Sequence, residues 1–127
     1  MYMNELVQVH GISIVDGKIL LIREKDVWGL PGGIIYPQEN NIECLVREVT
    51  HRIFPFCNLV VGEIYNIFFI ELAKERILRD SVYWIRVSGN ISKTGVQEIG
   101  YISGKEALAK NFIHKGIIEH LVMKKFL

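Results

Sequence analysis

The segment from Asn40 to Pro55 constrains the fold more than any other part of the chain. Asn40 followed three residues later by Glu43 has the pattern of a helix capping box. Pro55 cannot donate its amide, and it disfavours helical geometry in the residue before it. Between these signals the apolar residues recur at the spacing of one helix face: Ile42, Leu45, Val46, Val49 and Ile53. The sequence therefore predicts a helix over residues 41–53.

The two faces of this helix differ in chemistry. At about 100° per residue, the five apolar side chains fall within a stripe about 100° wide. The residues outside that stripe are Cys44, Arg47, Glu48, His51 and Arg52. We expect the apolar stripe to pack on the core and the polar side chains to share the opposite face.

Strand-like segments surround the helix. The Asp16-Gly17 pair joins the runs 6–15 and 18–24, and Asp-Gly between β-branched residues is a strong hairpin signal. A short strand in 27–33 is expected to end at Pro31 and two glycines, where a loop can approach a ligand. Further strands are predicted at 59–72, 81–87 and 96–103, with 73–80 as a connection.

Two helical segments close the chain. Residues 104–110 suggest one or two turns, and 112–127 repeat apolar residues at helical spacing, including Ile113, Ile117 and Leu121 with Ile118 and Val122 beside them. Strands thus dominate, with a helix in the middle and one at the end. This order predicts an α+β domain in which helices pack on the faces of a mixed sheet.

Composition limits the classes of function. Half of the 127 residues are hydrophobic, 23% are charged, and the formal net charge is +1. Neither sign of charge runs in a block, which argues against a broad surface for nucleic acid or anionic membrane. Apolar runs stop well short of a membrane span, and the N-terminus lacks a signal-peptide pattern. We expect a cytoplasmic protein that binds a small molecule; a homodimer is left open.

The stretch "GIIYPQENNIECLVREV", residues 33–49, resembles the signature of the Nudix hydrolase family. That signature runs Gly, five residues, Glu, seven residues, Arg-Glu, an aliphatic residue, any residue, Glu-Glu, any residue, Gly. The matching residues are Gly33, Glu39, Arg47, Glu48 and Val49. The preceding "WGLPGG" and the later "EIGYIS" and "GKEAL" are also similar to family segments, so the resemblance covers most of the chain. It implies that residues 1–127 form a single Nudix-like domain, an α/β/α sandwich with a mixed β-sheet.

The resemblance also implies a chemistry. Nudix hydrolases cleave a nucleoside diphosphate linked to another group, with Mg²⁺ or Mn²⁺ held mainly by glutamates of the signature helix. A diphosphate carries negative charge that repels a nucleophile, so the site must supply hard cations, and these cations require several carboxylate oxygens.

The chain departs from the signature at the residues that matter most for metal binding. His51 and Arg52 stand where the paired glutamates would be, and Phe54 replaces the final glycine. Glu48 and Arg52 are four residues apart, in the favourable order for a helical ion pair. A fixed guanidinium there repels a divalent cation and engages the remaining acid.

Several residues remain candidates for a site. Glu48 and Glu98 are the candidate catalytic acids. The candidate metal ligands are Glu39, Glu43, Glu48 and His51, although Glu43 also suits a helix cap and His51 a solvated side chain. The candidate ligand-binding residues are Gly32, Gly33, Arg47, Arg52 and Tyr36. Arg47 is also expected to pair with an acid and set the loop, and Tyr36 and Tyr65 to offer rings for stacking on a base.

Three functions follow from this set. The first is a Nudix domain that binds a nucleoside-diphosphate-linked ligand with its metal-dependent hydrolysis impaired or lost. The second is an active pyrophosphohydrolase that uses Mg²⁺ or Mn²⁺ held by relocated ligands. The third is an interaction scaffold, which makes no demand on the two glycines.

Overall fold

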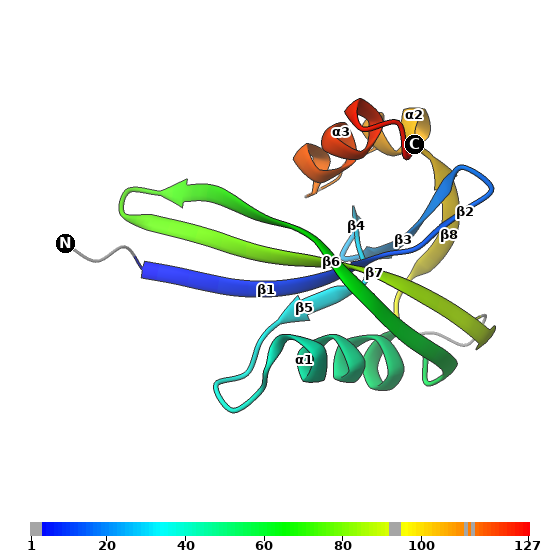
Figure 1. Cartoon of the computed structure of the whole chain (residues 1–127), viewed down its shortest axis with the longest axis horizontal. Coiled ribbons are helices and arrows are strands. Elements are labelled where there is room, and N and C mark those ends of the chain that lie inside the picture. Colours follow the sequence, from blue (N-terminus) through cyan, green and yellow to red (C-terminus); the bar gives the residue numbers. More distant parts are fainter. Residues whose placement is uncertain (1–3, 92–94, 111, 113) are drawn as a thin grey trace.

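The computed structural model describes residues 4–91, 95–110, 112 and 114–127. Two sheets lie between helices on opposite sides (Figure 1). The strands are β1 (Asn4–Ile12), β2 (Ile14–Val15), β3 (Lys18–Glu24), β4 (Val27–Gly29), β5 (Gly32–Ile34), β6 (Phe56–Ala73), β7 (Arg76–Asn90) and β8 (Glu98–Ser103). The helices are α1 (Asn41–Arg47) with its continuation η1 (Glu48–Ile53), α2 (Gly104–Leu108) and α3 (Lys115–Met123).

The first sheet has the strand order β5-β1-β7-β6. Its central pair, β1 and β7, is parallel and the other pairs are antiparallel, so the sheet is mixed. The second sheet is built on β3, which pairs with β2, β4 and β8. Ser13 separates β1 from β2, and the chain passes there from one sheet to the other.

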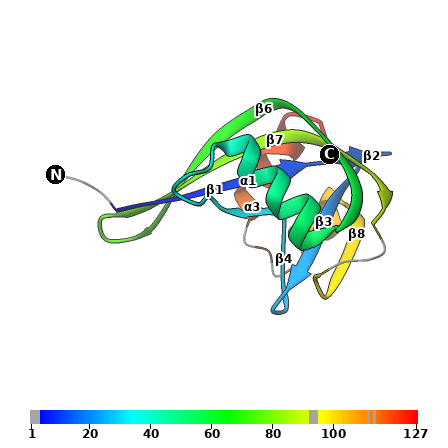
Figure 2. The ribbon, with the colours of Figure 1, turned by 90° about the horizontal axis from the view of Figure 1, so that it is seen from below.

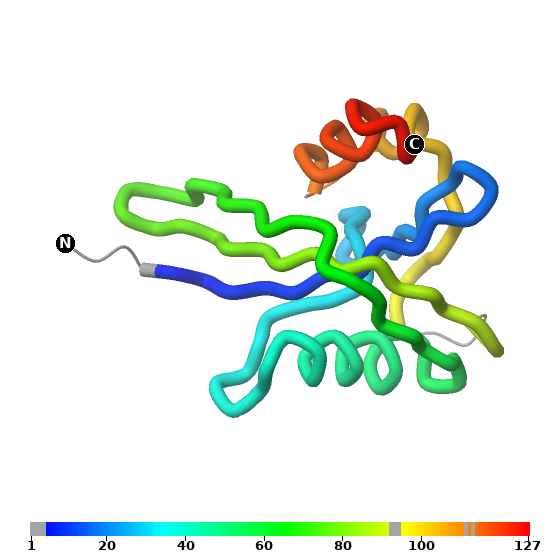
Figure 3. Tube along the Cα trace, in the orientation of Figure 1, coloured from blue at the N-terminus to red at the C-terminus, as the bar shows by residue number. Residues whose placement is uncertain are grey.

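Alternation along β3 builds a core on each side of the sheets. Because successive strand residues point to opposite faces, Ile19 and Leu21 pack with α3 while Leu20 and Ile22 pack with α1 and η1. The view from below shows α1 crossing one face, with α3 behind the strands (Figure 2). The tube in Figure 3 follows the same path from the first strand to the terminal helix. The expected α+β architecture, a Nudix-like α/β/α sandwich, is confirmed.

The local signals for the hairpin and the cap are also confirmed. Asp16 and Gly17 have φ of 52° and 73°, the left-handed pair that a tight hairpin between β2 and β3 requires. At the start of α1, the Asn40 side chain accepts from the amide of Glu43, and the Glu43 side chain accepts from the amide of Asn40.

The helix over residues 41–53 forms, but its second half is a π-helix. The amide of Phe54 donates to the carbonyl of Val49, five residues back, at 2.8 Å. The wider turn rotates the side chains that follow Arg47 relative to those of a regular α-helix. The period changes only after Arg47, so residues 41–47 keep the spacing that the face prediction assumed.

The predicted division of this helix into faces is partly wrong. Leu45, Val49 and Ile53 are fully buried as expected, whereas Ile42 and Val46 are 41% and 38% exposed. Two residues assigned to the polar face, Cys44 and Glu48, are buried. The buried side of the helix therefore extends to Cys44 and Glu48, which lie against Gly33 of β5.

Two strand predictions need correction. Residues 73–80 are not a connection: β6 and β7 form one long hairpin that turns at Lys74 and Glu75, where Glu75 has a φ of 61°. Gly32 and Gly33 are not a loop either, since they begin β5 and pair with His10 and Val9 of β1.

The final helix agrees with its prediction except at the edges. Ile117, Ile118 and Leu121 are buried, whereas Val122 is 38% exposed. Ile113, assigned to the same stripe, lies outside the described residues. Among the described residues, no helix has both the length and the apolar character needed to cross a membrane.

Backbone strain at the hairpin is open to a direct test. Gly17 has a positive φ and no neighbouring atom near the place of an added Cβ, so Gly17→Ala adds strain without a clash. We expect a loss of about 1–2 kcal/mol in the free energy of unfolding, measured by urea denaturation. Gly116 in α3 is equally open but has ordinary helical backbone, so Gly116→Ala should raise the same quantity by up to about 1 kcal/mol. If both substitutions changed the free energy of unfolding by the same amount in the same direction, this explanation would be contradicted.

Candidate functional site

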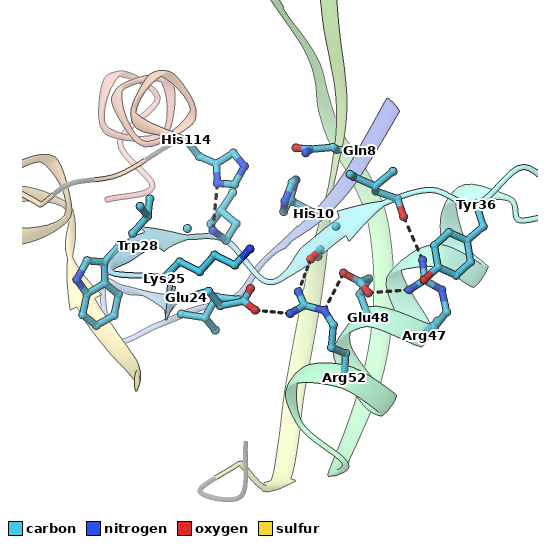
Figure 4. Close-up of a pocket in the computed structure, with 17 residues that line it drawn as sticks. Gln8, His10, Glu24, Lys25, Trp28, Tyr36, Arg47, Glu48, Arg52 and His114 are labelled. Carbon is cyan, nitrogen blue, oxygen red and sulfur yellow. Dashed lines mark hydrogen bonds and ion pairs between the residues drawn. The ribbon is translucent and has the colours of Figure 1, made fainter. Parts of the chain in front are cut away.

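A cavity of about 530 Å³ lies between β1, β5, η1 and the β3–β4 turn (Figure 4). One end is lined by Trp28, Leu30 and His114, and the other by Tyr36, Arg47, Glu48 and Arg52. The volume is in the range of pockets that hold small organic ligands. The residues of the signature helix thus face one end of a pocket of ligand size.

Glu48 is the acid at the centre of the charged end. It is 6% exposed, and its two carboxylate oxygens accept from different arginines. Oε2 accepts from Nη1 of Arg47 at 2.7 Å, and Oε1 accepts from Nε of Arg52 at 3.0 Å. A Cβ at Gly33 would lie 1.8 Å from Oε1. Any side chain at position 33 would displace the Glu48 carboxylate, so this arrangement requires glycine there.

The guanidinium of Arg52 is surrounded by three oxygen acceptors. Besides Glu48, its Nη1 donates to Oε2 of Glu24 at the end of β3, and its Nη2 donates to the carbonyl of Gly32 at 3.1 Å. Burial opposes the charge, but the carboxylates of Glu24 and Glu48 outweigh burial and raise the pKa of Arg52. The residue at the position of a signature glutamate is thus a cation held by three separate segments.

Gly32 presents its carbonyl to Arg52 from a backbone conformation that disfavours other residues. Its φ is 145°, and an added Cβ would lie 2.1 Å from the carbonyl oxygen of Val9. Close pairing with β1 therefore accounts for the first glycine of the pair, and contact with Glu48 accounts for the second.

Arg47 closes the loop that precedes the helix. Its Nε and Nη2 donate to the two oxygens of Glu39 at 2.6 and 3.0 Å, and Nη2 also donates to the carbonyl of Ile34 at 3.1 Å. The hydrogen bond from Arg47 holds the pKa of Glu39 below its usual value. The Arg47 guanidinium also lies 3.7 Å from the centre of the Tyr36 ring. One face of that ring is thus already covered.

The remaining candidates from the sequence lie elsewhere. Glu43 caps α1, and His51 is exposed on η1. Glu98 is 52% exposed and pairs with Arg23 at 2.9 Å. Tyr65 contacts His120 and a group of aromatic rings against α3. None of these four lines the cavity.

Sequence reasoning missed several residues that line the cavity: Gln8, His10, Glu24, Lys25 and His114. Gln8 and His10 are two apart on β1, so their shared face follows from strand periodicity. The others reach the cavity only through tertiary structure. Nothing local in the sequence marks Glu24 as a partner of Arg52.

Fold and cavity define an α/β/α domain with a ligand-sized pocket beside a capped helix. The family model described as NUDIX domain matches residues 6–52. The resemblance to the Nudix family seen in the sequence is therefore confirmed over this part of the chain. A comparison with curated protein sequences gives no match.

Several solved structures have the same fold. The E. coli ORF135 protein superposes with a TM-score of 0.81 at 23% identity, over 97% of this chain and 92% of that one. The MutT protein from Methanosarcina mazei Go1 gives 0.72 at 20% identity, over 98% of both chains. A UDP-X diphosphatase gives 0.77 at 18% identity, over all of this chain and 66% of that one. At these identities the likeness concerns the fold.

The burial of Glu48 sets the size of its contribution to stability. Removing its charge leaves two guanidinium groups without a shared buried partner, so Glu48→Gln should lower the free energy of unfolding by about 3 kcal/mol. Glu24 is 40% exposed in its side chain, and Glu24→Gln should cost less than about 1 kcal/mol. Urea denaturation of both variants checks the order, and an equal loss would contradict the central role of Glu48.

Proposed function

We propose that the chain binds a nucleoside-diphosphate-linked ligand in this cavity and that Arg52 replaces the divalent cation, so that metal-dependent hydrolysis is impaired or lost. The observation that carries the proposal is the environment of the Arg52 guanidinium. Two carboxylates and a backbone carbonyl surround it, and such oxygens are the ligands that Mg²⁺ prefers. The site already contains a cation, and that cation is a side chain.

The residues present do not fit a metal beside this guanidinium. Both oxygens of Glu48 are engaged by arginines, Glu24 by Arg52, and Glu39 by Arg47. Two like unit charges about 4 Å apart cost about 4 kcal/mol near a protein surface, and a divalent ion doubles that cost.

The charged end of the cavity offers donors for an anionic ligand. Each nitrogen of the Arg52 guanidinium donates once within the described part of the chain, so the second hydrogens of its terminal nitrogens can reach a phosphate oxygen. Lys25 lines the same cavity. At the opposite end, Trp28 and Leu30 supply apolar surface for the uncharged part of the ligand. The similar fold of a UDP-X diphosphatase supports a diphosphate-linked class of ligand.

The alternative is an active pyrophosphohydrolase, and one observation favours it. The side chain of Arg52 is 38% exposed, so it can leave toward solvent without unpacking the core. Its departure would free Glu48, Glu24 and the Gly32 carbonyl, three oxygen donors that already converge. In this alternative the relocated ligand is Glu24, which the sequence did not single out.

The two functions predict opposite effects at position 52. If the guanidinium replaces the metal, Arg52→Glu should increase Mn²⁺ affinity at least about tenfold, because a charge change of two units turns repulsion into attraction. Titration calorimetry measures that affinity, and chromatography of products from UDP-glucose and ADP-ribose measures any metal-dependent turnover that appears.

A neighbouring position provides the control. His51 is exposed on the same helix and does not line the cavity. His51→Glu alone should leave Mn²⁺ affinity near that of the parent protein, and the double variant should behave like Arg52→Glu. Unchanged Mn²⁺ affinity in the double variant would overturn the proposal, and so would metal-dependent turnover by the parent that Glu48→Gln abolishes.

A further inference from the structure

His10 lies at the middle of the cavity and takes no part in the arginine cluster. It is on β1 directly opposite Gly32, the residue whose carbonyl accepts from Arg52. The residue is 4% exposed and lines the cavity. Figure 4 shows it between His114 on one side and the Glu48–Arg52 pair on the other.

A buried carboxylate fixes the orientation of this imidazole. Nδ1 of His10 lies 2.8 Å from Oδ1 of Asp80, which is on β7 and fully buried. An ionised carboxylate only accepts, so Nδ1 carries a proton and donates it to Asp80. The position at which the ring gains or loses a proton is therefore Nε2.

His114 has the opposite arrangement. The amide of Leu30 donates to its Nδ1 at 3.2 Å, so the proton of the neutral ring is on Nε2. Burial, with a smaller effect of His10, lowers the pKa of His114 well below its usual value, and this ring stays neutral. It contacts the His10 ring with centroids 4.2 Å apart.

The same arrangement argues against a metal between these residues. Ligand atoms of His10, Asp80 and His114 lie within 4.8 Å of one another, a spacing that a metal ion would tolerate. However, a protonated Nε2 has no lone pair to offer. Metal-bound histidines normally donate from their other nitrogen, whereas Nδ1 of His114 accepts. Nε2 of His114 instead lies 3.6 Å from Oδ2 of Asp80, and neither atom has a hydrogen-bond partner among the described residues.

The charges around His10 indicate what the imidazole could contribute to ligand binding. Glu24, Glu39 and Glu48 are matched by Lys25, Arg47 and Arg52, so the charged end of the site is close to neutral before a ligand arrives. Among the described residues, the titratable and charged groups that contact His10 or line the cavity with it are Asp80 on β7, His114 before α3, Tyr36 after β5, Arg47 on α1, Glu48 and Arg52 on η1, Glu24 at the end of β3 and Lys25 in the β3–β4 turn. A diphosphate brings two negative charges that this balance does not offset.

We propose that His10, held by Asp80, is a binding residue for the anionic part of the ligand, and that it takes up a proton when the ligand binds. Asp80 accepts from Nδ1–H, and the added proton makes Nε2 a donor for the anionic part of the ligand. The inference rests on the proposed function, since it concerns the same diphosphate ligand. By linkage, the affinity should fall as pH rises, by up to about tenfold per pH unit.

The test is titration calorimetry with ADP-ribose in EDTA, because neither phosphate of its diphosphate bridge titrates near neutrality. Binding at about pH 7 in buffers of different ionisation enthalpy gives the number of protons taken up. We expect net uptake by the parent protein and none by His10→Gln, whose affinity at low pH should fall to the level of the parent at high pH. Asp80→Asn should reduce the uptake. His51→Gln, which removes an exposed imidazole outside the cavity, should leave it unchanged.

The outcomes separate the two proposals. Binding by the parent without proton uptake would overturn the role of His10 and leave the proposed function standing. Uptake that persists in a folded His10→Gln variant would also overturn it. If neither ADP-ribose nor UDP-glucose binds at any pH, the proposed function fails and this inference fails with it. Thermal unfolding identifies a variant that does not fold, in which case the buffer series on the parent protein decides.

Discussion

The contact of the Arg52 guanidinium with the Glu48 carboxylate determines how the rest of the site is built. Through it η1 is joined to the end of β3 at Glu24 and to β5 at the Gly32 carbonyl. These three segments form the charged end of the cavity. Without Arg52, the buried carboxylate of Glu48 would keep only Arg47 as its charged partner. Breaking one partner from a buried ion pair costs more stability than the intact pair contributes. Under the proposed function, the arginine at position 52 replaces a metal as the cation of the site and leaves the overall architecture in place.

The geometry around this contact explains the two glycines and Arg47. Gly33 leaves room for the Glu48 carboxylate, and Gly32 allows β5 to pair closely with β1. Arg47 shares Glu48 with Arg52 and anchors the loop through Glu39. Gly33, Glu39, Arg47 and Glu48 thus make structural contacts that do not require a metal. Because these contacts can persist without catalysis, the fold alone does not establish an activity.

Much of the frame was predictable from local sequence, whereas the site was predictable only in part. The Asp16-Gly17 turn and the Asn40–Glu43 cap follow from short-range rules and are confirmed. The faces of the helix were partly misassigned because Cys44 and Glu48 pack against Gly33 of β5, a tertiary contact that helical spacing alone does not reveal. Glu24, His10 and Asp80 come from three strands that meet only in the folded chain, and a single sequence carries no signal for such a meeting.

The most direct test of the account is the dependence of ligand affinity on metal. Titration of the parent protein with ADP-ribose, in EDTA and then in excess Mg²⁺ or Mn²⁺, measures whether the Arg52 guanidinium is sufficient as the cation of the site. The account predicts the same affinity in all three conditions, with the ligand recovered intact. Affinity that appears only with metal, accompanied by cleavage of the diphosphate, would contradict it.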